Sequence, residues 1–397
     1  MTNNRILFLG ASGFQIPVIN QAKEMGLYVG VVDYNNKAPA ILYADKYYEC
    51  SIKDEEAVLD IARSFKADAI CVGVCDSAMN TAAFVCEKLN LHGTSRNVAA
   101  NVTDKFRMIE LFEKNGVAHP DYQLIKKEEL LTAELMIEYP LVTKPIDAAG
   151  SKGIHIVRDK SGIDDALMDS SKCGYSGDVI VEEMMEGPEV SVELIVQDGV
   201  PFVAQVTDKL TTGEPFFIEV GHTQPSQLKR EELEKIKKLA CDAALAVGLL
   251  NSIAHAEVML TKKGPKMVEI AGRLGGGGTA EQLIKLSGGY NLPEATINFS
   301  FGKKYEMPSR TESKSSAVRF IISKEGVVKS IRGVEKAREI RGVHEVNLMF
   351  QVGDVFTDAK DNSGRIGYVI ASAETQEEAV SICYKALDLI NVEVERA

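Results

Sequence analysis

Short apolar runs alternate with longer amphipathic stretches over the first hundred residues of the chain. Strands that are apolar throughout and alternate with helices are typical of a parallel sheet covered on both faces. Three runs have the length of buried strands, namely Arg5–Leu9, Tyr28–Val32 and Ala69–Gly73. A helix-like spacing of apolar residues follows the first and the last of these runs. We therefore predict a doubly wound α/β domain over residues 1–100.

Strand runs and helices continue through the rest of the chain in a different arrangement. Between residues 101 and 186, a helix capped by Thr103 or Asp104 precedes three short strand runs. Between residues 187 and 310, longer strand runs surround one charged helix, and residues 311–397 have the pattern of a small α+β domain. The sequence therefore predicts an α/β and α+β multidomain protein with four segments, at 1–100, 101–186, 187–310 and 311–397.

Composition narrows the classes of partner. A chain of 397 residues is long enough for two to four domains. Its formal net charge of −12 and pI near 5.2 argue against a nucleic-acid surface, which needs clustered basic residues. It has no apolar run of the length that crosses a membrane, about 18 residues or more. We expect a cytoplasmic protein whose seven cysteines are buried, reduced thiols, with neither nucleic acid nor membrane as partner.

Two glutamates in the third segment form the strongest chemical signal. Glu257 and Glu269 lie in strand runs separated by the turn Lys263-Gly-Pro265, which predicts a hairpin that brings them together. Two carboxylates supply the oxygen ligands that Mg²⁺ prefers. Arg273 and the glycines 275–278 follow directly, so a cation and flexible backbone lie beside the carboxylates. This combination indicates a magnesium–nucleotide site for phosphoryl transfer.

Two features of the second segment fit the same chemistry. The loop Asp147–Gly153 joins two strand runs, and its backbone N–H groups, with Lys144 and Lys105, can bind phosphates. The loop is not a Walker A sequence, and a plain hairpin with two solvated lysines is the alternative interpretation. The run Val179–Glu189 can offer backbone groups and methionine side chains to an adenine ring, or is a strand that leaves the core through a polar turn.

Taken in order, these motifs resemble those of the ATP-grasp superfamily. The resemblance covers essentially the whole chain, and its branch looks most like the L-amino acid ligases among the carboxylate–amine ligases. It rests on five motifs: Asp104-Lys105, Lys144-Pro145 with Gly150–Gly153, Glu182-Glu183-x-x-Glu-Gly-x-Glu189, Glu257 with Glu269, and Arg273. The resemblance implies an N-terminal pre-ATP-grasp domain, a lid subdomain, a metal and substrate subdomain, and a small C-terminal domain.

The resemblance also implies a mechanism. ATP and Mg²⁺, with Mn²⁺ as a substitute, convert a substrate carboxylate into an acylphosphate, and an amine then displaces phosphate to form an amide or peptide bond. By the same resemblance the substrates would be small molecules, namely amino acids, and the protein would be a homodimer. The implied ATP-binding residues are Lys105, Lys144, Ser151, Glu182, Glu183, Met185 and Glu189, and the implied metal ligands are Glu257 and Glu269.

Further site residues follow from the same resemblance. Arg273 would neutralise the acylphosphate, and His222, which we place in a loop after a glycine, would act as an acid, a base or an oxyanion partner. Lys209, Gly276 and Gly277 would line the substrate site. One position departs from the pattern, because Ala271 stands where many relatives carry an asparagine ligand, which puts a second metal ion in doubt.

Three alternatives stay open. The first is an ATP-grasp enzyme of purine biosynthesis or of the carbamoyl-phosphate synthase type. The second is a nucleotide-binding regulatory protein without turnover. The third is a dinucleotide-binding oxidoreductase, which the turn Gly10–Gly13 and Asp33 suggest, although a complete GxGxxG is absent.

Overall fold

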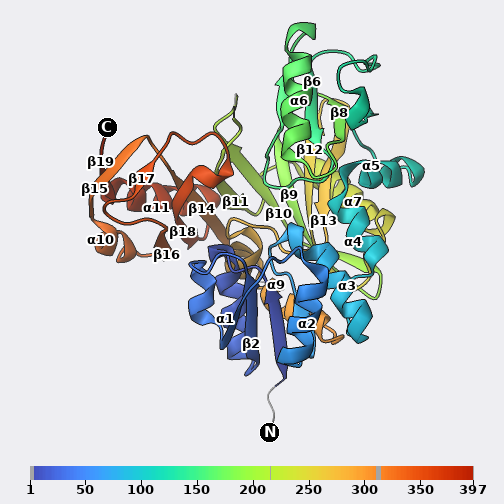
Figure 1. Cartoon of the computed structure of the whole chain (residues 1–397). Coiled ribbons are helices and arrows are strands. Elements are labelled where there is room, and N and C mark those ends of the chain that lie inside the picture. The colour runs from blue at the N-terminus through green and yellow to red at the C-terminus, as the bar shows by residue number, and fades with distance from the viewer. Residues whose placement is uncertain (1–3, 215, 310–313, 397) are drawn as a thin grey trace.

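The computed structural model describes residues 4–214, 216–309 and 314–396 and contains four β-sheets (Figure 1). In the view of Figure 1 the N-terminal sheet lies at the bottom, the sheet of the second segment stands at the top with its helix α6, and the C-terminal segment lies to the left. A long antiparallel sheet connects them. The candidate residues of the sequence analysis come mainly from this long sheet and from the segment above it.

The N-terminal sheet is parallel, with the strand order β3-β2-β1-β4, as the sequence predicts. Gly30 lies opposite Leu7, and a Cβ there would come within 2.8 Å of both the Leu7 and Phe65 side chains, so only glycine fits beneath α2. Half-exposed β3 was not predicted, because its sequence is polar. The elements are β1 Arg5–Leu9, α1 Ile16–Glu24, β2 Tyr28–Asp33, β3 Lys46–Glu49, α2 Glu55–Phe65, β4 Ala69–Cys71 and α3 Met79–Leu89.

The second segment forms a four-stranded antiparallel sheet in the order β5-β8-β6-β7. Asp104 caps the helix that precedes it, accepting hydrogen bonds from the backbone N–H groups of Phe106 (2.9 Å) and Arg107 (3.1 Å). Asp104 is therefore the cap, and Thr103 ends the preceding helix. The elements are α4 Arg96–Thr103, α5 Lys105–Lys114, β5 Tyr122–Ile125, β6 Leu141–Pro145, β7 His155–Val157, α6 Ile163–Cys173 and β8 Val179–Glu183.

The long sheet has eight antiparallel strands in the order β13-β12-β9-β10-β11-β14-β18-β16. Strands from both sides of residue 310 take part, so the third and fourth segments share one sheet. The predicted glutamate hairpin is confirmed as β12 and β13. The strands and helices of the third segment are β9 Glu189–Gln197, β10 Val200–Thr211, β11 Glu219–Gln224, α7 Arg230–Ala246, β12 Ser252–Thr261, β13 Gly264–Ala271, α8 Ile284–Gly288 and α9 Leu292–Ser300.

The C-terminal segment adds three strands to the long sheet and three to a small sheet, β17-β15-β19. The sequence missed the small sheet, because its strands are short or partly exposed. Helix α11 packs on β14 and β18 with Ala379, Cys383 and Ala386 buried. The elements are β14 Ser315–Ile322, β15 Gly326–Arg332, α10 Val334–Arg338, β16 Val343–Leu348, β17 Val355–Phe356, β18 Arg365–Ala373, α11 Gln376–Leu389 and β19 Asn391–Glu395.

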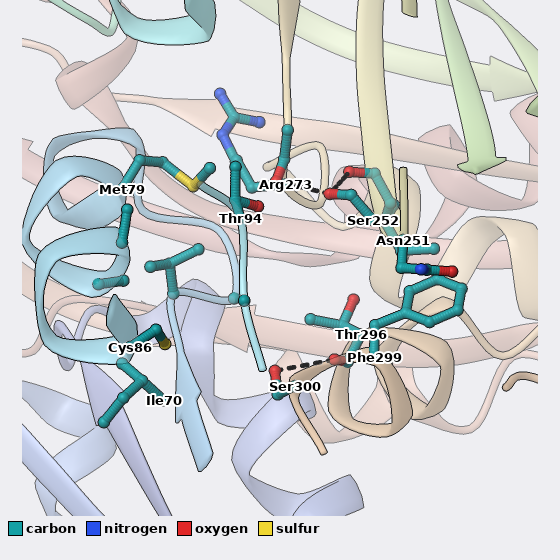
Figure 2. A pocket seen from close by; sticks show the side chains of 17 residues that line it. Ile70, Met79, Cys86, Thr94, Asn251, Ser252, Arg273, Thr296, Phe299 and Ser300 are labelled. Carbon is teal, nitrogen blue, oxygen red and sulfur yellow. Dashed lines mark hydrogen bonds between the residues drawn. The ribbon is translucent and has the colours of Figure 1, made fainter. Parts of the chain in front are cut away.

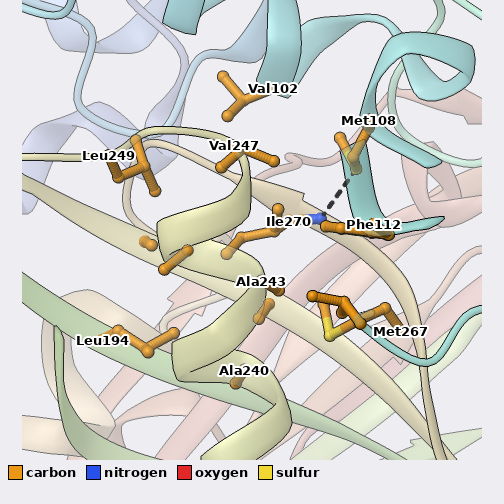
Figure 3. Packing of buried hydrophobic residues seen from close by; sticks show 14 of the residues in the cluster. Val102, Met108, Phe112, Leu194, Ala240, Ala243, Val247, Leu249, Met267 and Ile270 are labelled. Carbon is orange, nitrogen blue, oxygen red and sulfur yellow. Dashed lines mark hydrogen bonds between the residues drawn. The ribbon is translucent and has the colours of Figure 1, made fainter. Parts of the chain in front are cut away.

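Helix α7 closes the largest apolar cluster against the back of the long sheet (Figure 3). Ala240, Ala243 and Val247 recur at helical spacing, and their small side chains let the helix approach Leu194 and Ile270 closely. Burying one large aliphatic side chain contributes roughly 1.5–3 kcal/mol. This core fixes β12 and β13, and with them the backbone of the two glutamates.

The prediction that all seven cysteines are buried thiols is confirmed only in part. All seven cysteines are free thiols, but Cys71, Cys86 and Cys383 alone are buried, and Cys173 is exposed. No helix within the described ranges is both long enough and apolar enough to cross a membrane.

Candidate active site

The two hairpin glutamates are register partners on adjacent strands. Glu257 on β12 lies directly opposite Glu269 on β13, and a bulge follows between Glu257 and Val258. A bulge re-aims the side chains beside it, and bulges are common next to active sites. Among the described residues, no group of three or more His, Cys, Asp and Glu side chains forms a ready metal site. The pair could therefore hold a metal ion only together with oxygens from a ligand or from water.

Lys209 on β10 lies among three carboxylates. Its Nζ is 2.5 Å from Glu189 Oε1, 3.1 Å from Glu257 Oε1 and 3.4 Å from Glu219 Oε1, and its side chain is 6% exposed. Burial alone would lower the pKa of Lys209, but these carboxylates raise it well above its usual value. Lys209 thus holds three carboxylates together, and one of them is the metal candidate Glu257.

Burial and charge shift the pKa values of the neighbouring Glu189 and Glu257 in opposite directions. Burial raises the pKa of Glu189 to about 7, although Lys209 opposes that rise. Burial would also raise the pKa of Glu257, but Lys209 and His255 hold it well below its usual range. Glu257 is therefore the ionised oxygen donor of the cluster, as metal ligation requires.

His255 supports Glu257 from the same strand. Its Nδ1 lies 2.5 Å from Glu193 Oε1 and its Nε2 lies 3.4 Å from Glu257 Oε1. Burial would lower the pKa of His255, but the fully buried Glu193 carboxylate outweighs it and raises the pKa to about 10. His255 is therefore an imidazolium that holds Glu257 in place, which agrees with the shared face that alternation along the strand predicts.

Two lysines of the second segment face the hairpin. Lys144 Nζ donates to Glu182 Oε2 at 2.7 Å, with both side chains buried. Lys105 Nζ donates to the Ala148 backbone oxygen at 2.6 Å and lies 3.6 Å from Glu269 Oε2. These contacts argue against the alternative of two solvated lysines.

The loop between β6 and β7 is built for close approach of a ligand. Gly150, Ser151 and Gly153 have φ angles of 75°, 60° and 69°, and Ser151 is exposed. Ser151 adopts a left-handed conformation that is uncommon for a residue other than glycine. Successive turns of this kind leave backbone N–H groups available for an anion.

The end of β8 leaves a backbone donor available. Lys266 pairs with the Glu183 side chain, and the Glu183 N–H donates to Asp121 O at 2.9 Å. Across the described ranges, the N–H of Met185 makes no hydrogen bond. A backbone N–H that follows a buried strand in this way can donate to a ligand such as an adenine ring.

Arg273 connects β13 to the N-terminal segment. Its Nε donates to Asp76 Oδ1 at 2.7 Å, and its Nη1 donates to Leu274 O at 2.7 Å. Burial would lower the pKa of Arg273, but Asp76 holds it above its usual value. A cavity of about 70 Å³ lies behind the guanidinium, among Met79, Thr94 and other side chains (Figure 2). Arg273 is thus charged and oriented by Asp76.

The structure corrects the expected position of His222, which lies within β11 and is 3% exposed rather than in a loop. Its Nε2 lies 3.3 Å from Glu219 Oε2, but neither ring nitrogen makes a well-aligned hydrogen bond among the described residues. Burial lowers the pKa of His222, so the ring is neutral at pH 7. A Cβ on Gly277 would lie 3.4 Å from Nε2, so the glycine run passes beside this ring.

The C-terminal segment contributes a cation that sequence reasoning missed. Arg365 Nη1 donates to Glu219 Oε2 at 2.8 Å, and its guanidinium lies over the Phe320 ring at 4.7 Å from the centroid. Phe320 also packs against His222 at 5.7 Å between ring centroids. No local motif marks Arg365, since it meets Glu219 across 146 positions of sequence.

The predicted site residues thus gather in one region, where the second segment faces the hairpin and β10. Lys209 lies beside the metal candidates, and Gly277 lies near His222. Gly276, which precedes Gly277 in the chain, is half-buried.

Comparison with known proteins identifies similar domains in two parts of the chain. Residues 137–281 match the model of the ATP-grasp domain, and residues 319–395 match that of L-amino acid ligase C-terminal domain 2. The uncharacterized protein y4rH of Sinorhizobium fredii is 25% identical over 321 residues, which cover 80% of this chain and 66% of that protein. Alanine–anticapsin ligase of Bacillus subtilis is 27% identical over 278 residues, which cover 64% of this chain and 58% of that protein.

A solved structure extends the likeness to the whole chain. The L-amino acid ligase of Bacillus licheniformis superimposes with a TM-score of 0.86 at 23% identity and covers 100% of both chains, which shows a common fold. The chain spans less than two thirds of the length of the two curated relatives above. Residues 137–281 are thus similar to an ATP-grasp domain, and the predicted ATP-grasp fold is confirmed. The chain is similar to a carboxylate–amine ligase in sequence, and to L-amino acid ligases in its C-terminal part and in its fold.

Proposed function

We propose that this protein is an ATP-dependent ligase that joins a carboxylate to an amine through an acylphosphate, with release of ADP and phosphate. The observation that supports it most is the convergence of Glu257 and Glu269 with Lys105 and Lys209 beside a buried, oriented Arg273. Phosphoryl transfer needs positioning and neutralised charge rather than a protein nucleophile. These groups supply both.

The carboxylate pair fits Mg²⁺, or Mn²⁺ in its place, as the ion that accompanies ATP. When bound, the ion would supply positive charge to the phosphates and to the developing acylphosphate. Glu257 and Glu269 would hold it, with the remaining ligands coming from phosphate and water, because Ala271 supplies no side-chain oxygen.

The nucleotide would lie between the second segment and the hairpin. Lys105, Lys144 and the Ser151 loop would bind the phosphates, as their charge and backbone conformation suit anions. The end of β8 would bind adenine and ribose, with Met185 donating through its backbone. The residues that we assign to this end are Glu182, Glu183, Met185 and Glu189.

The reacting carboxylate would lie between Arg273 and the glycine run. Arg273 would neutralise the acylphosphate and the tetrahedral species that the amine forms. Neutral His222 would accept or donate a proton beside Gly276 and Gly277, and Lys209 would hold the adjacent carboxylates in register. The similarity to an alanine–anticapsin ligase and to an L-amino acid ligase supports amino acids as the substrates.

Three further assignments belong to this proposal. The segments 1–100, 101–186, 187–310 and 311–397 would act as the pre-ATP-grasp, lid, metal and substrate, and C-terminal units. The protein would work as a homodimer on small molecules, without nucleic acid or membrane. A cytoplasmic location is supported by the seven free thiols.

The test is to incubate the full chain with Mg-ATP and pooled amino acids and to identify nucleotides and condensed products by mass spectrometry. We expect ADP, phosphate and a new amide. Glu269→Gln should abolish product formation with the fold intact by circular dichroism, whereas Glu231→Gln on the exposed face of α7 should leave it unchanged. AMP with pyrophosphate would contradict the acylphosphate route, and unchanged activity of Glu269→Gln would contradict the metal assignment.

The same experiment separates the alternatives. ATP that binds but is not consumed in any pool would favour the regulatory protein. When the assay is repeated with a purine precursor or bicarbonate in place of the amino acids, ATP consumption in that repeat alone would favour the purine or carbamoyl-phosphate type.

A further inference from the structure

Arg365 on β18 is held where three segments of the chain meet. Its Nη1 donates to Glu219 Oε2 at 2.8 Å, and its Nε donates to the Asn362 backbone oxygen at 3.1 Å. The Asn362 side-chain oxygen in turn accepts from the Glu219 backbone N–H at 2.9 Å. The guanidinium lies over Phe320 at 4.7 Å and over Phe14 of the N-terminal segment at 5.8 Å from the ring centroids. These contacts fix the position of the guanidinium.

One nitrogen of this guanidinium remains open. Within the described ranges, Nη2 of Arg365 makes no hydrogen bond. It differs in this respect from Nε of Arg319, which also lacks a partner but is enclosed by the protein. Nη2 is not enclosed, and the Arg365 side chain is 12% exposed. An arginine fixed at Nε and Nη1 therefore presents Nη2 to the space beside it.

Open space lies next to the guanidinium along the glycine run. A Cβ on Gly277 would lie 3.4 Å from Arg365 Nη1, so this backbone adjoins the guanidinium. A Cβ on the preceding Gly276 would meet no described atom within 4 Å. Four residues of extended chain span at most about 14 Å, so the backbone of Gly277 lies within that distance of Arg273. The open space therefore follows the backbone from Arg365 toward the place that we assign to the reacting carboxylate.

The proposed function requires a cation for a second carboxylate. When two amino acids are joined, one reacts through its carboxylate and the other through its amine. The second amino acid therefore keeps a free carboxylate. A carboxylate removed from water needs a charged or hydrogen-bonded partner, and the planar N–H groups of arginine suit its two oxygens.

The proposed function already uses the other cations of the site. Lys105 and Lys144 are assigned to the phosphates of ATP, and Arg273 is assigned to the acylphosphate. Lys209 is 6% exposed and lies among three carboxylates. Arg365 is the cation that this assignment leaves for the second carboxylate.

We propose that Arg365 binds the free carboxylate of the amine substrate, which makes that substrate an amino acid rather than a simple amine. Glu219 and Asn362 orient the guanidinium, and Nη2 donates to the carboxylate. Phe14 lies beside the guanidinium, so the N-terminal segment borders this subsite. The inference rests on the proposed function, because it concerns the substrate whose amine attacks the acylphosphate.

The first test compares an amino acid with its own α-amide as the amine substrate. The full chain, Mg-ATP and pooled L-amino acids first identify the joined pair by mass spectrometry. The amino acid on the amine side of that product is then replaced by its α-amide, which keeps the amine and the shape but loses the negative charge. We expect a KM for the amide about tenfold or more above that for the amino acid, because a hydrogen bond to a charged group is lost. Equal KM values would overturn the inference, and this comparison needs no variant.

Variants assign the preference to Arg365. Arg365→Met should raise the KM for the amino acid about tenfold or more and leave the KM values for the α-amide and for ATP unchanged. A merely structural role would change all three values together. Arg365→Lys keeps a positive charge and should keep part of the preference. Arg63→Met, on the exposed face of α2, is the matched control and should behave as the wild type does. An unchanged preference for the acid in Arg365→Met would overturn the inference.

A binding measurement needs no turnover. Differential scanning fluorimetry with Mg²⁺ and a non-hydrolysable ATP analogue would compare each L-amino acid with its α-amide. At least one amino acid should raise Tm more than its amide does. Arg365→Met should lose this difference although Arg273, which would bind the reacting carboxylate, is intact. The same effect of every acid and its amide would overturn the inference.

The two kinds of measurement also separate this inference from the proposed function. ADP and amide formation without any preference for the acid would reject the inference alone. An acid preference in binding that depends on Arg365, without ADP formation from any pool, would reject the proposed function and leave the carboxylate subsite in place.

Discussion

Replacing Lys209 by methionine tests the electrostatics of the candidate site most sharply. The substitution keeps the length of the side chain and removes the charge that lies within 3.4 Å of Glu189, Glu219 and Glu257. These carboxylates are only 18–25% exposed, so water replaces the lost partner poorly. We expect a large loss of stability without a metal ion.

The size of the expected loss of stability follows from the burial of the Lys209 side chain. Removing one partner of a buried ion pair costs about 3–5 kcal/mol. Arg365 still neutralises Glu219, so the lower end of that range is expected. At about 2 °C or less per kcal/mol for a chain of this size, Tm should fall by about 5 °C.

Two conditions should reverse the loss. Mg²⁺ can replace the missing positive charge, so Mg²⁺ should raise Tm more in Lys209→Met than in the wild type. The pKa of Glu189, raised to about 7 in the wild type, should rise further without Lys209. A carboxyl with a raised folded pKa is least destabilising below its unfolded pKa, near 4.5, and becomes more destabilising as pH rises through its folded value. Lowering the pH from 8 to 5.5 should therefore narrow the difference in Tm.

The assay is differential scanning fluorimetry with and without MgCl₂ at pH 5.5 and 8. Lys235→Met is the matched control, because Lys235 is 60% exposed and pairs with Glu231 on the surface of α7. Such a pair is worth about 0–1 kcal/mol. The same Tm for Lys209→Met and the wild type, or no added stabilisation by Mg²⁺, would refute the reasoning.

Three further predictions concern Phe112 in the core, Arg273 in the candidate site, and the buried carboxyl group of Glu281. Phe112→Ala, in the cluster beneath α7, should cost about 3–5 kcal/mol and lower the urea midpoint of unfolding, whereas an unchanged midpoint would contradict the packing of Figure 3. Arg273→Met should lower kcat by about 100-fold or more, as loss of an oxyanion donor does, with little change in the KM for ATP; a change in that KM alone would contradict its role. Glu281→Gln should raise Tm at pH 8.5 and leave it unchanged near pH 4. The reason is that the folded pKa of Glu281, about 8, exceeds its unfolded value, so the charged carboxylate destabilises the fold only as pH rises. A lower Tm at pH 8.5 would contradict the burial of this carboxylate without a partner.

The elements with strong local signals were predictable from sequence. The turn signal Lys263-Gly-Pro265 and the apolar alternation around it predicted the hairpin, but the observed turn is at Lys262 and Lys263, because Gly264 and Pro265 already belong to β13. The pairing of Glu257 with Glu269 also depends on the bulge beside Glu257, which the sequence did not reveal. Asp104 capped its helix as expected, since an aspartate before an amphipathic run satisfies free N–H groups.

Other parts of the site depend on contacts between distant residues. His222 was misplaced because β11 is short and its neighbours are β10 and β14, the second of which lies far along the chain. Arg365 meets Glu219 only when the fourth segment extends the long sheet. Glu281 has no local motif, and its buried, unpartnered state arises only where three parts of the chain close around it.

Transfer of oxygen from carboxylate to phosphate tests the central claim most directly. The protein would be incubated with Mg-ATP and a pool of amino acids whose carboxyl oxygens are ¹⁸O, and the released phosphate analysed by mass spectrometry. An acylphosphate route predicts one ¹⁸O atom in each phosphate formed with the amide, because amide formation leaves that oxygen on phosphorus. Label in AMP, or amide formation with unlabelled phosphate, would contradict the account.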